Sequence, residues 1–356
     1  MRKVLLVCGK PPEQTCPFLV ESLRSELNPR RISTTQMHKT TKRGFLKAAL
    51  ASGLALEAFP ARSASQKSSE QLITIIDLDK CDGCSGLPIP ACVKACRTKN
   101  QARYPEPQKP LQAYWPQPKY EDFSNDRDNI SRLTPYNWIY LQHVSVDGKD
   151  IYLPRRCMQC FDAPCRKLCP FGAIDQTKQG AVKIDDRVCF GGAKCRDVCP
   201  WNIPQRQAGV GIYLKVEPKL AGGGVMYKCD FCADLIAQGK EPACSAECPK
   251  KAMMVLSISQ AEEKLKSLAK GRFVYGKEEN GGTATWYVCS VPFEKINRQL
   301  KTQLPKNHPG RPLMNEVDSK LSPSTPLVLG TLAAPIVALG VSVALRKRKN
   351  DKDQSQ

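Results

Sequence analysis

Cysteine spacing constrains the fold of this 356-residue chain more than any other feature. Fifteen of its 18 cysteines fall into four runs: CDGC with CVKAC, CMQC with CRKLCP, CF with CRDVCP, and CDFC with CSAECP. Each run places thiolates close together on a turn and another on the segment that follows, which suits the several faces of an iron–sulfur cluster. The last cysteine of such a run ligates the neighbouring cluster, so runs function in pairs. Four runs therefore predict two dicluster modules.

Two other kinds of site also use paired cysteines: a disulfide framework and zinc ribbons. Zinc ribbons stop at two CxxC pairs. A disulfide framework gives no reason for CxxC to be followed repeatedly by a cysteine and then CxxxCP, which closes three of the four runs. The spacing therefore favours iron–sulfur clusters over both alternatives.

The N-terminal region predicts export. The sequence TKRGFLK at 41–47 precedes an apolar run at 48–59, which looks like a twin-arginine signal with lysine in the first arginine position. The alternative is a basic helix start before a core helix. Residues 1–36 precede Met37 and are interpreted as a mis-assigned start or an N-terminal extension, so the expected signal covers 37–64.

The C-terminal region predicts a membrane anchor. Residues 327–345 carry no charge and are followed by Arg-Lys-Arg-Lys. At about 1.5 Å per residue this segment covers roughly 28 Å, close to the thickness of a bilayer core. We therefore expect a transmembrane helix at 327–345 and a cytoplasmic tail at 346–356, which together place the body on the periplasmic face of the cytoplasmic membrane. A buried C-terminal helix is the alternative.

The net charge of +20 raises the question of a nucleic-acid partner. Much of the charge lies at the two ends of the chain, and no nucleic-acid motif accompanies it. We expect no nucleic acid, and interpret the remaining charge as a solvated basic surface or one that faces an acidic protein.

The body of the chain predicts an α+β fold of two ferredoxin-like modules related by a pseudo-twofold repeat, with long loop insertions and the C-terminal transmembrane helix. Apolar segments such as 72–79 lead directly into cysteine runs, as strands lead into cluster turns. A helix is expected at 259–270, capped by Ser259 and Glu262. Rings in the arm either lie against a partner subunit or cover the clusters. The expected parts are a first dicluster module (72–96 with 225–256), a proline- and aromatic-rich arm (97–155), a second dicluster module (156–205) and a helix and strand extension (257–322).

Several segments resemble a known family, the four-cluster iron–sulfur (beta) subunits of membrane-bound molybdopterin oxidoreductases. The likeness is strongest to the beta subunit of formate dehydrogenase, and a hydrogenase iron–sulfur subunit is also similar. The segments that carry the resemblance are IIDLDKCDGC, RRCMQCFDAPCRKLCPFGAI, CFGGAKCRDVCPWNIP, YKCDFCADLIAQGKEPACSAECPKKA and GGTATWYV.

The resemblance implies which cysteines share a cluster, because in that family the first run pairs with the fourth and the second with the third. The implied ligands are Cys81, Cys84, Cys92 and Cys248 for cluster 1; Cys229, Cys232, Cys244 and Cys96 for cluster 2; Cys157, Cys160, Cys165 and Cys199 for cluster 3; and Cys189, Cys195 and Cys169 for cluster 4.

Cluster 4 lacks one thiolate, because Gly192 stands where the family pattern has its remaining cysteine. Glycine has no side chain to bind iron. We expect three 4Fe-4S clusters and, at the Gly192 site, either a 3Fe-4S cluster or an atypical 4Fe-4S cluster with a ligand such as water or a carboxylate. Cys289 is expected to be a buried core thiol.

The resemblance implies electron transfer rather than catalysis, because clusters held by thiolates on all sides leave no iron open to substrate. The implied partners are a molybdopterin catalytic subunit, with formate as the preferred substrate, and a cytochrome b or quinone-reactive membrane subunit. The alternatives are the iron–sulfur subunit of a membrane-bound NiFe hydrogenase and a structural or anchoring module. No catalytic residue is expected.

Overall fold

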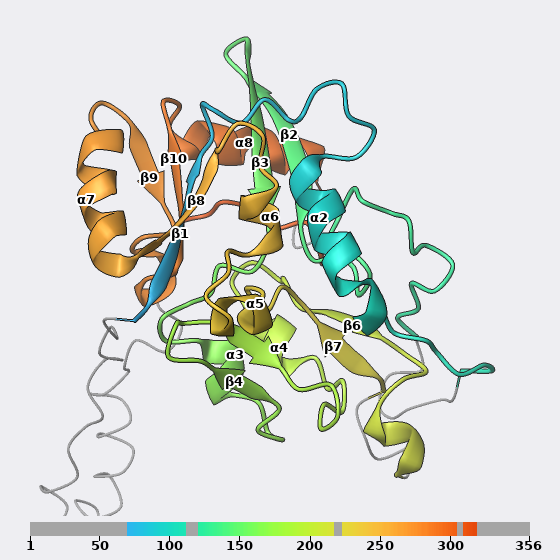
Figure 1. The fold of residues 1–356 in the computed structure, drawn as a ribbon. Coiled ribbons are helices and arrows are strands. Elements are labelled where there is room, and N and C mark those ends of the chain that lie inside the picture. The colour runs from blue at the N-terminus through green and yellow to red at the C-terminus, as the bar shows by residue number, and fades with distance from the viewer. Residues whose placement is uncertain (1–69, 112–119, 217–222, 305–308, 319–356) are drawn as a thin grey trace, which may run out of the picture. The chain divides into compact units, whose positions relative to one another are not determined.

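A computed structural model of the chain describes residues 70–111, 120–216, 223–304 and 309–318. The described part is a mixture of short strands and short helices, as Figure 1 shows. Its strands are β1 (Leu72–Asp77), β2 (Tyr140–Val146), β3 (Lys149–Arg155), β4 (Ile174–Gln176), β5 (Val182–Ile184), β6 (Gln205–Gln207), β7 (Val225–Tyr227), β8 (Met253–Ser257), β9 (Phe273–Tyr275) and β10 (Thr285–Cys289).

The α-helices are mostly a single turn long. They are α2 (Ala91–Asn100), α3 (Pro164–Lys167), α4 (Lys194–Asp197), α5 (Ala233–Ala237), α6 (Ala243–Ala246), α7 (Ile258–Leu268) and α8 (Phe293–Gln303), with 3₁₀ turns η2 (Gln101–Arg103), η3 (Ile212–Lys215) and η4 (Glu279–Gly281).

Each cysteine run begins shortly after a strand ends, as the sequence predicted for two of them. The strands β1, β3, β5 and β7 lead into the runs that start at Cys81, Cys157, Cys189 and Cys229. Short helices then carry later cysteines of the runs, and these helices pack in two pairs, α2 with α6 and α3 with α4. This pairing brings the first run to the fourth and the second to the third.

A four-stranded sheet with the order β8-β1-β10-β9 closes one end of the described residues. Strand β1 is parallel to β10, with Thr74 opposite Thr285, and antiparallel to β8. Helix α7 contacts β1 and β8 (Figure 1). Between helix and sheet lies an apolar core that includes Ile73, Ile75 and Trp286, all fully buried. A segment that precedes the first cysteine run is thus joined to segments that follow the fourth.

The start of helix α7 differs from the prediction by two residues. The capping box consists of Ser257 and Gln260 rather than Ser259 and Glu262. The reason is that β8 runs directly into the helix, so the last strand residue is also the N-cap.

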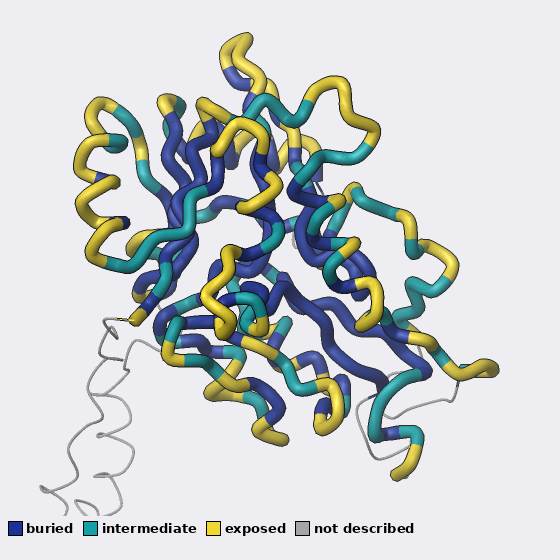
Figure 2. Tube along the Cα trace, viewed as in Figure 1, coloured by how far each residue is buried: buried dark blue, intermediate teal, exposed yellow. Residues whose placement is uncertain are grey.

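The proline- and aromatic-rich arm is folded into the molecule rather than extended. It contains the antiparallel hairpin β2–β3, and helix α8 contacts β2. Tyr136 and Trp138 are buried, and the Trp138 ring stacks on Tyr227 with 6.5 Å between centroids. Figure 2 shows most of the hairpin strands and of this end of the arm as buried. These two rings therefore cover the interior of this chain, which agrees with the second of the two interpretations above.

The predicted localisation requires a correction. No helix among the described residues is long and apolar enough to cross a bilayer. The expected anchor at 327–345, its tail at 346–356, the expected signal at 37–64 and residues 1–36 lie outside the described residues. The placement of the body on a periplasmic membrane face by a C-terminal helix is wrong on this finding and is withdrawn.

Candidate iron–sulfur sites

Fifteen cysteines of the described residues form four sets of sulfur atoms, and none of them is in a disulfide. Set 1 is Cys81, Cys84, Cys92 and Cys248, which line one cavity of about 350 Å³. The first three come from the loop after β1 and from helix α2, whereas Cys248 follows α6. The contact between α2 and α6 is therefore what completes this set.

Set 3 is built in the same way. Cys157, Cys160, Cys165 and Cys199 line a cavity of about 360 Å³, and Cys199 comes from the third run. Set 4 lies beside it, where Cys169, Cys189, Cys195 and Gly192 line a cavity of about 380 Å³. The three cavities are nearly equal in volume, as expected if each holds a cofactor of similar size.

Set 2 lies where helices α2, α5 and α6 meet the loop after β7. Cys96 is within electrostatic range of Cys229, Cys232 and Cys244. All four side chains are buried. Cys96 lies one helical turn beyond Cys92 of set 1 on α2, so sets 1 and 2 are separated by little more than a turn, roughly 5–6 Å between Cβ atoms.

The same one-turn spacing links sets 3 and 4. Cys165 belongs to set 3 and Cys169 to set 4, whereas Cys195 belongs to set 4 and Cys199 to set 3. Sets 2 and 3 meet at Gln159, a fully buried residue in the turn between Cys157 and Cys160. Its Nε2 donates to the carbonyl oxygen of Cys229 at 3.1 Å. The four sets therefore follow one another in the order 1, 2, 3, 4.

The electrostatics of the sets test whether they fit an iron–sulfur cofactor. Burial raises the pKa of Cys81 to about 11 and that of Cys232 to about 12, and neighbouring cysteine sulfurs raise both further. Several thiolates gathered in so dry a place repel one another and need a cationic centre to bind. Iron supplies that centre, and its binding is coupled to loss of the thiol protons. The donor sets fit iron–sulfur clusters.

A single metal ion fits these sets less well. Around one zinc ion with Zn–S bonds of about 2.3 Å, the sulfurs would lie roughly 3.8 Å apart. Within the described ranges, no three His, Cys, Asp or Glu side chains are grouped closely enough to hold one ion. The sulfurs therefore surround a larger cofactor.

The cavity of set 4 has a different lining from the others. Gly192 is exposed, and a Cβ atom at its position would meet no atom within 4 Å. Among the described residues that line the cavity, no side chain carries an oxygen, and the donor atoms besides the cysteines belong to Lys194 and Met226. No carboxylate among them replaces the missing thiolate.

Three buried polar residues near the sulfurs were not singled out from the sequence: Arg156, Gln159 and Lys228. Arg156 and Gln159 both approach the sulfur of Cys229 at 3.8 Å, and the backbone N–H of Phe231 donates to it at 3.4 Å. The signal that could have found the two cations is their position, because each directly precedes a CxxC pair. Hydrogen bonds and net charge at the sulfurs are among the factors that set cluster potential.

Both buried cations remain protonated. Burial lowers the pKa of Lys228, but the sulfurs of Cys157, Cys165 and Cys229 raise it by more, so that the pKa lies above its ordinary value. Burial likewise opposes the charge of Arg156, while Cys244 and Cys229 favour it and the net shift in its pKa is upward. A positive side chain is therefore fixed in the interior at each of these places.

These features define a class: an electron-transfer protein built from dicluster ferredoxin modules. Two family models, each described as a 4Fe-4S dicluster domain, match residues 80–173 and 149–258. Iron–sulfur clusters of the 4Fe-4S type are thus supported by both the sulfur sets and the family models.

Curated relatives narrow the class further. The nitrate-inducible formate dehydrogenase iron–sulfur subunit of Escherichia coli is 32% identical over 232 residues, which cover 61% of this chain and 68% of that protein. The menaquinone reductase iron–sulfur cluster-binding subunit of Nitratidesulfovibrio vulgaris is 28% identical over 242 residues, covering 59% and 84%. A subunit of the anaerobic dimethyl sulfoxide reductase of Escherichia coli is 36% identical over 118 residues, covering 33% and 51%.

The chain thus belongs to the family of iron–sulfur subunits of molybdopterin oxidoreductases. The resemblance seen in the sequence is confirmed at this level. The relatives are electron-transfer subunits of oxidoreductase complexes, which agrees with a chain that has no catalytic activity alone. The match spans between half and about four fifths of the relatives named here.

Proposed function

We propose that this chain relays single electrons between a molybdopterin subunit that oxidises formate and a membrane subunit that carries a haem or reacts with quinone. The observation that carries the proposal is the order of the four sulfur sets, each within about a helical turn or one hydrogen bond of the next. A structural module would not need its cofactors in a line. Formate is preferred because of the similarity to the formate dehydrogenase subunit.

The proposed ligands are the members of the four sets, with three 4Fe-4S clusters at sets 1, 2 and 3. When bound, such clusters supply one-electron oxidation and reduction. The chain's own residues hold the sulfurs, keep water from the buried members and place cations and amides beside them. Residues 72–96 with 225–256 and residues 156–205 are the two modules of this proposal.

At set 4 we propose a 3Fe-4S cluster. Support comes from the three cysteines of the cavity, from Gly192 in place of a fourth, and from the lack of a side-chain oxygen among its described lining residues. A 4Fe-4S cluster would need a solvent ligand at the exposed Gly192 position. Loss of a thiolate also changes the charge of the site, which sets this site apart in potential from the others.

A second candidate is supported by the relative from Nitratidesulfovibrio vulgaris, because this chain covers 84% of that menaquinone reductase subunit. In this alternative the same relay delivers electrons to menaquinone from a donor other than formate. The two candidates share the clusters and differ in the subunits at the two ends of the relay.

The test is an anaerobic potentiometric titration of the cluster-loaded full chain, followed by EPR. Four one-electron centres, one of them with the isotropic signal of an oxidised 3Fe-4S cluster, are expected. Clusters that stay silent over the accessible potentials would contradict the relay. The partner is then identified by purifying the tagged chain with its complex and assaying formate-dependent and menaquinol-dependent dye reduction. Activity with menaquinol alone would favour the second candidate.

A further inference from the structure

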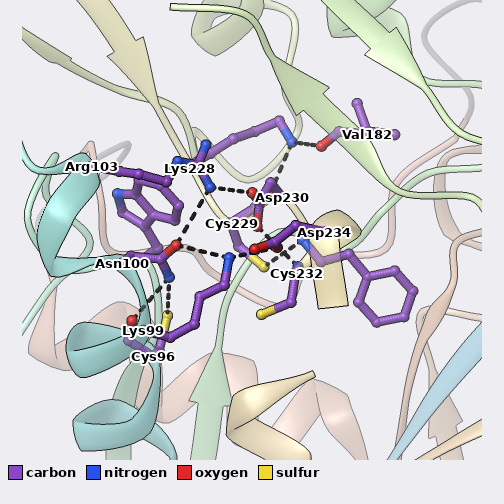
Figure 3. A network of polar contacts seen from close by, with 12 residues as sticks. Cys96, Lys99, Asn100, Arg103, Val182, Lys228, Cys229, Asp230, Cys232 and Asp234 are labelled. Carbon is purple, nitrogen blue, oxygen red and sulfur yellow. Dashed lines mark hydrogen bonds and ion pairs between the residues drawn. The ribbon is translucent and has the colours of Figure 1, made fainter. Parts of the chain in front are cut away.

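One cation stands at the junction of the two modules. The Lys228 side chain lines the cavity of set 3 together with Cys157, Cys165 and Cys199. Its ammonium group donates to the carbonyl oxygens of Val182 and of Cys229, the latter at 3.1 Å, and Cys229 belongs to set 2. Figure 3 shows the lysine next to Cys229, with its ammonium reaching Val182. One positive charge is therefore in contact with both inner sets.

The charge of Lys228 is not neutralised by an ion pair within the described residues. The nearest acid in sequence, Asp230, pairs with Arg103 at 2.5 Å and accepts from the backbone N–H of Cys232 at 2.9 Å. Figure 3 shows this pair on the other side of the loop from the lysine ammonium. Lys228 is only 6% exposed, so solvent screens its field weakly.

Arg156 provides an internal comparison. Its Nη1 approaches the Cys229 sulfur at 3.8 Å, its Nη2 donates to the Thr74 hydroxyl at 2.5 Å, and its guanidinium lies over the Phe231 ring. Its sulfur contacts are with set 2, whereas Lys228 is shared between sets 2 and 3. The two cations therefore predict different patterns of effect.

We propose that Lys228 is a positioning residue for electron transfer, whose shared charge raises the reduction potentials of both inner clusters and holds them close to each other. Reduction adds one negative charge to a site, and a fixed cation nearby stabilises the reduced state. An electron that passes from set 2 to set 3 leaves one neighbour of Lys228 and arrives at another. The lysine therefore favours neither direction, and no proton or bond change accompanies the step.

This inference rests on the proposed ligand sets, and its test uses the cluster-loaded full chain. Lys228→Met removes the charge at similar size, Lys228→Gln removes it but keeps an N–H donor, and Lys228→Arg keeps the charge. Arg156→Gln and the exposed Lys183→Met are the comparison variants. Potentials are measured by anaerobic EPR titration, with signals assigned through Cys232→Ser for set 2 and Cys165→Ser for set 3.

We expect both neutral Lys228 variants to lower the equilibrium constant for one-electron reduction at sets 2 and 3 about tenfold or more, which corresponds to about 59 mV per tenfold. Lys228→Arg restores most of the loss. Arg156→Gln shifts set 2 alone, and Lys183→Met shifts neither set.

Unshifted potentials in the neutral variants, or a shift confined to one set, contradict the inference. Failure of both neutral variants to load clusters, with normal loading of Lys228→Arg, also contradicts it, because the lysine would then serve folding. A wild-type chain whose clusters cannot be reduced would instead overturn the proposed function, so the two failures are distinct.

Discussion

The Arg206 guanidinium donates to the carbonyl oxygen of Gly191 at 3.0 Å, immediately before the glycine that stands in place of a ligand. Arg206 is also paired with Glu121 at 2.8 Å, and Glu121 holds Arg196 of helix α4 in a two-pronged contact at 2.6 and 2.7 Å. One carboxylate thus connects the arm to both sides of the set 4 loop.

Replacement of Glu121 should destabilise this region. Glu121→Gln leaves two largely buried guanidinium groups without their carboxylate, and we expect a loss of about 2 kcal/mol in the free energy of unfolding. Urea titrations under anaerobic conditions measure it. Glu106→Gln is the matched control, because the Glu106–Arg127 pair has similar geometry but lies on the surface, and it should have no measurable effect.

The same contact should depend on pH. Burial raises the pKa of Glu121, but Arg196 and Arg206 lower it by more, so that the folded pKa is below the ordinary value. A lowered folded pKa means that the contribution is fully present above the unfolded pKa, about 4.3, and is lost as the pH falls through the folded pKa. The stability difference between wild type and Glu121→Gln should therefore shrink between pH 7 and pH 4. A constant difference would argue against the ion pair.

Gly192→Cys should convert the 3Fe-4S site into a 4Fe-4S site. A Cβ atom at Gly192 has open space around it, and the added thiol would lie at the cavity of set 4. The isotropic EPR signal of the oxidised 3Fe-4S cluster should disappear, with a gain of iron. Gly191→Cys is the control: its φ is +66° and its Cβ would lie 2.5 Å from the Gly224 oxygen, so it should damage the fold without adding a ligand. Retention of the signal in Gly192→Cys would contradict the assignment.

Cys248→Ala should remove the cluster of set 1 and spare the cluster of set 2, although Cys229, Cys232 and Cys244 belong to the same run as Cys248. EPR of the loaded variant checks this, and loss of the set 2 signal alone would show that the runs pair differently. Cys289→Ala serves as the control. It removes a fully buried thiol outside the four sets and should keep every signal, at a cost of about 1 kcal/mol in stability.

Removal of iron should abolish cooperative unfolding. Cysteines of all four sets are part of or packed against the main apolar core, so the cofactors fill space inside it and neutralise crowded thiolates. Without them the core has cavities and mutually repelling sulfurs. A ferrous chelator under reducing conditions should therefore eliminate the cooperative urea transition seen by circular dichroism. A folded iron-free chain with an unchanged transition midpoint would contradict this expectation.

The cysteine spacing predicted much of this arrangement because ligand chemistry leaves few choices. The strand before Cys81, the strand that ends at Cys289 and the burial of Cys289 agree with the structure. The role of Arg156 and Lys228 beside the sulfurs could not be predicted, because a basic residue before CxxC is usually solvated. The β2–β3 hairpin was also missed, since prolines obscured its alternation. These features depend on contacts between segments far apart in the sequence.

The parallel pairing of β1 with β10 has a consequence for the order in which the chain is made. Sets 3 and 4 consist of residues between Cys157 and Cys199, so their sulfurs are complete while later segments are still being synthesised. Sets 1 and 2 must wait for Cys244 and Cys248, and strand β1 must wait longer still for Thr285. During synthesis the earliest cysteines are thus the last to be enclosed, and their protection from oxygen depends on how quickly the end of the chain arrives.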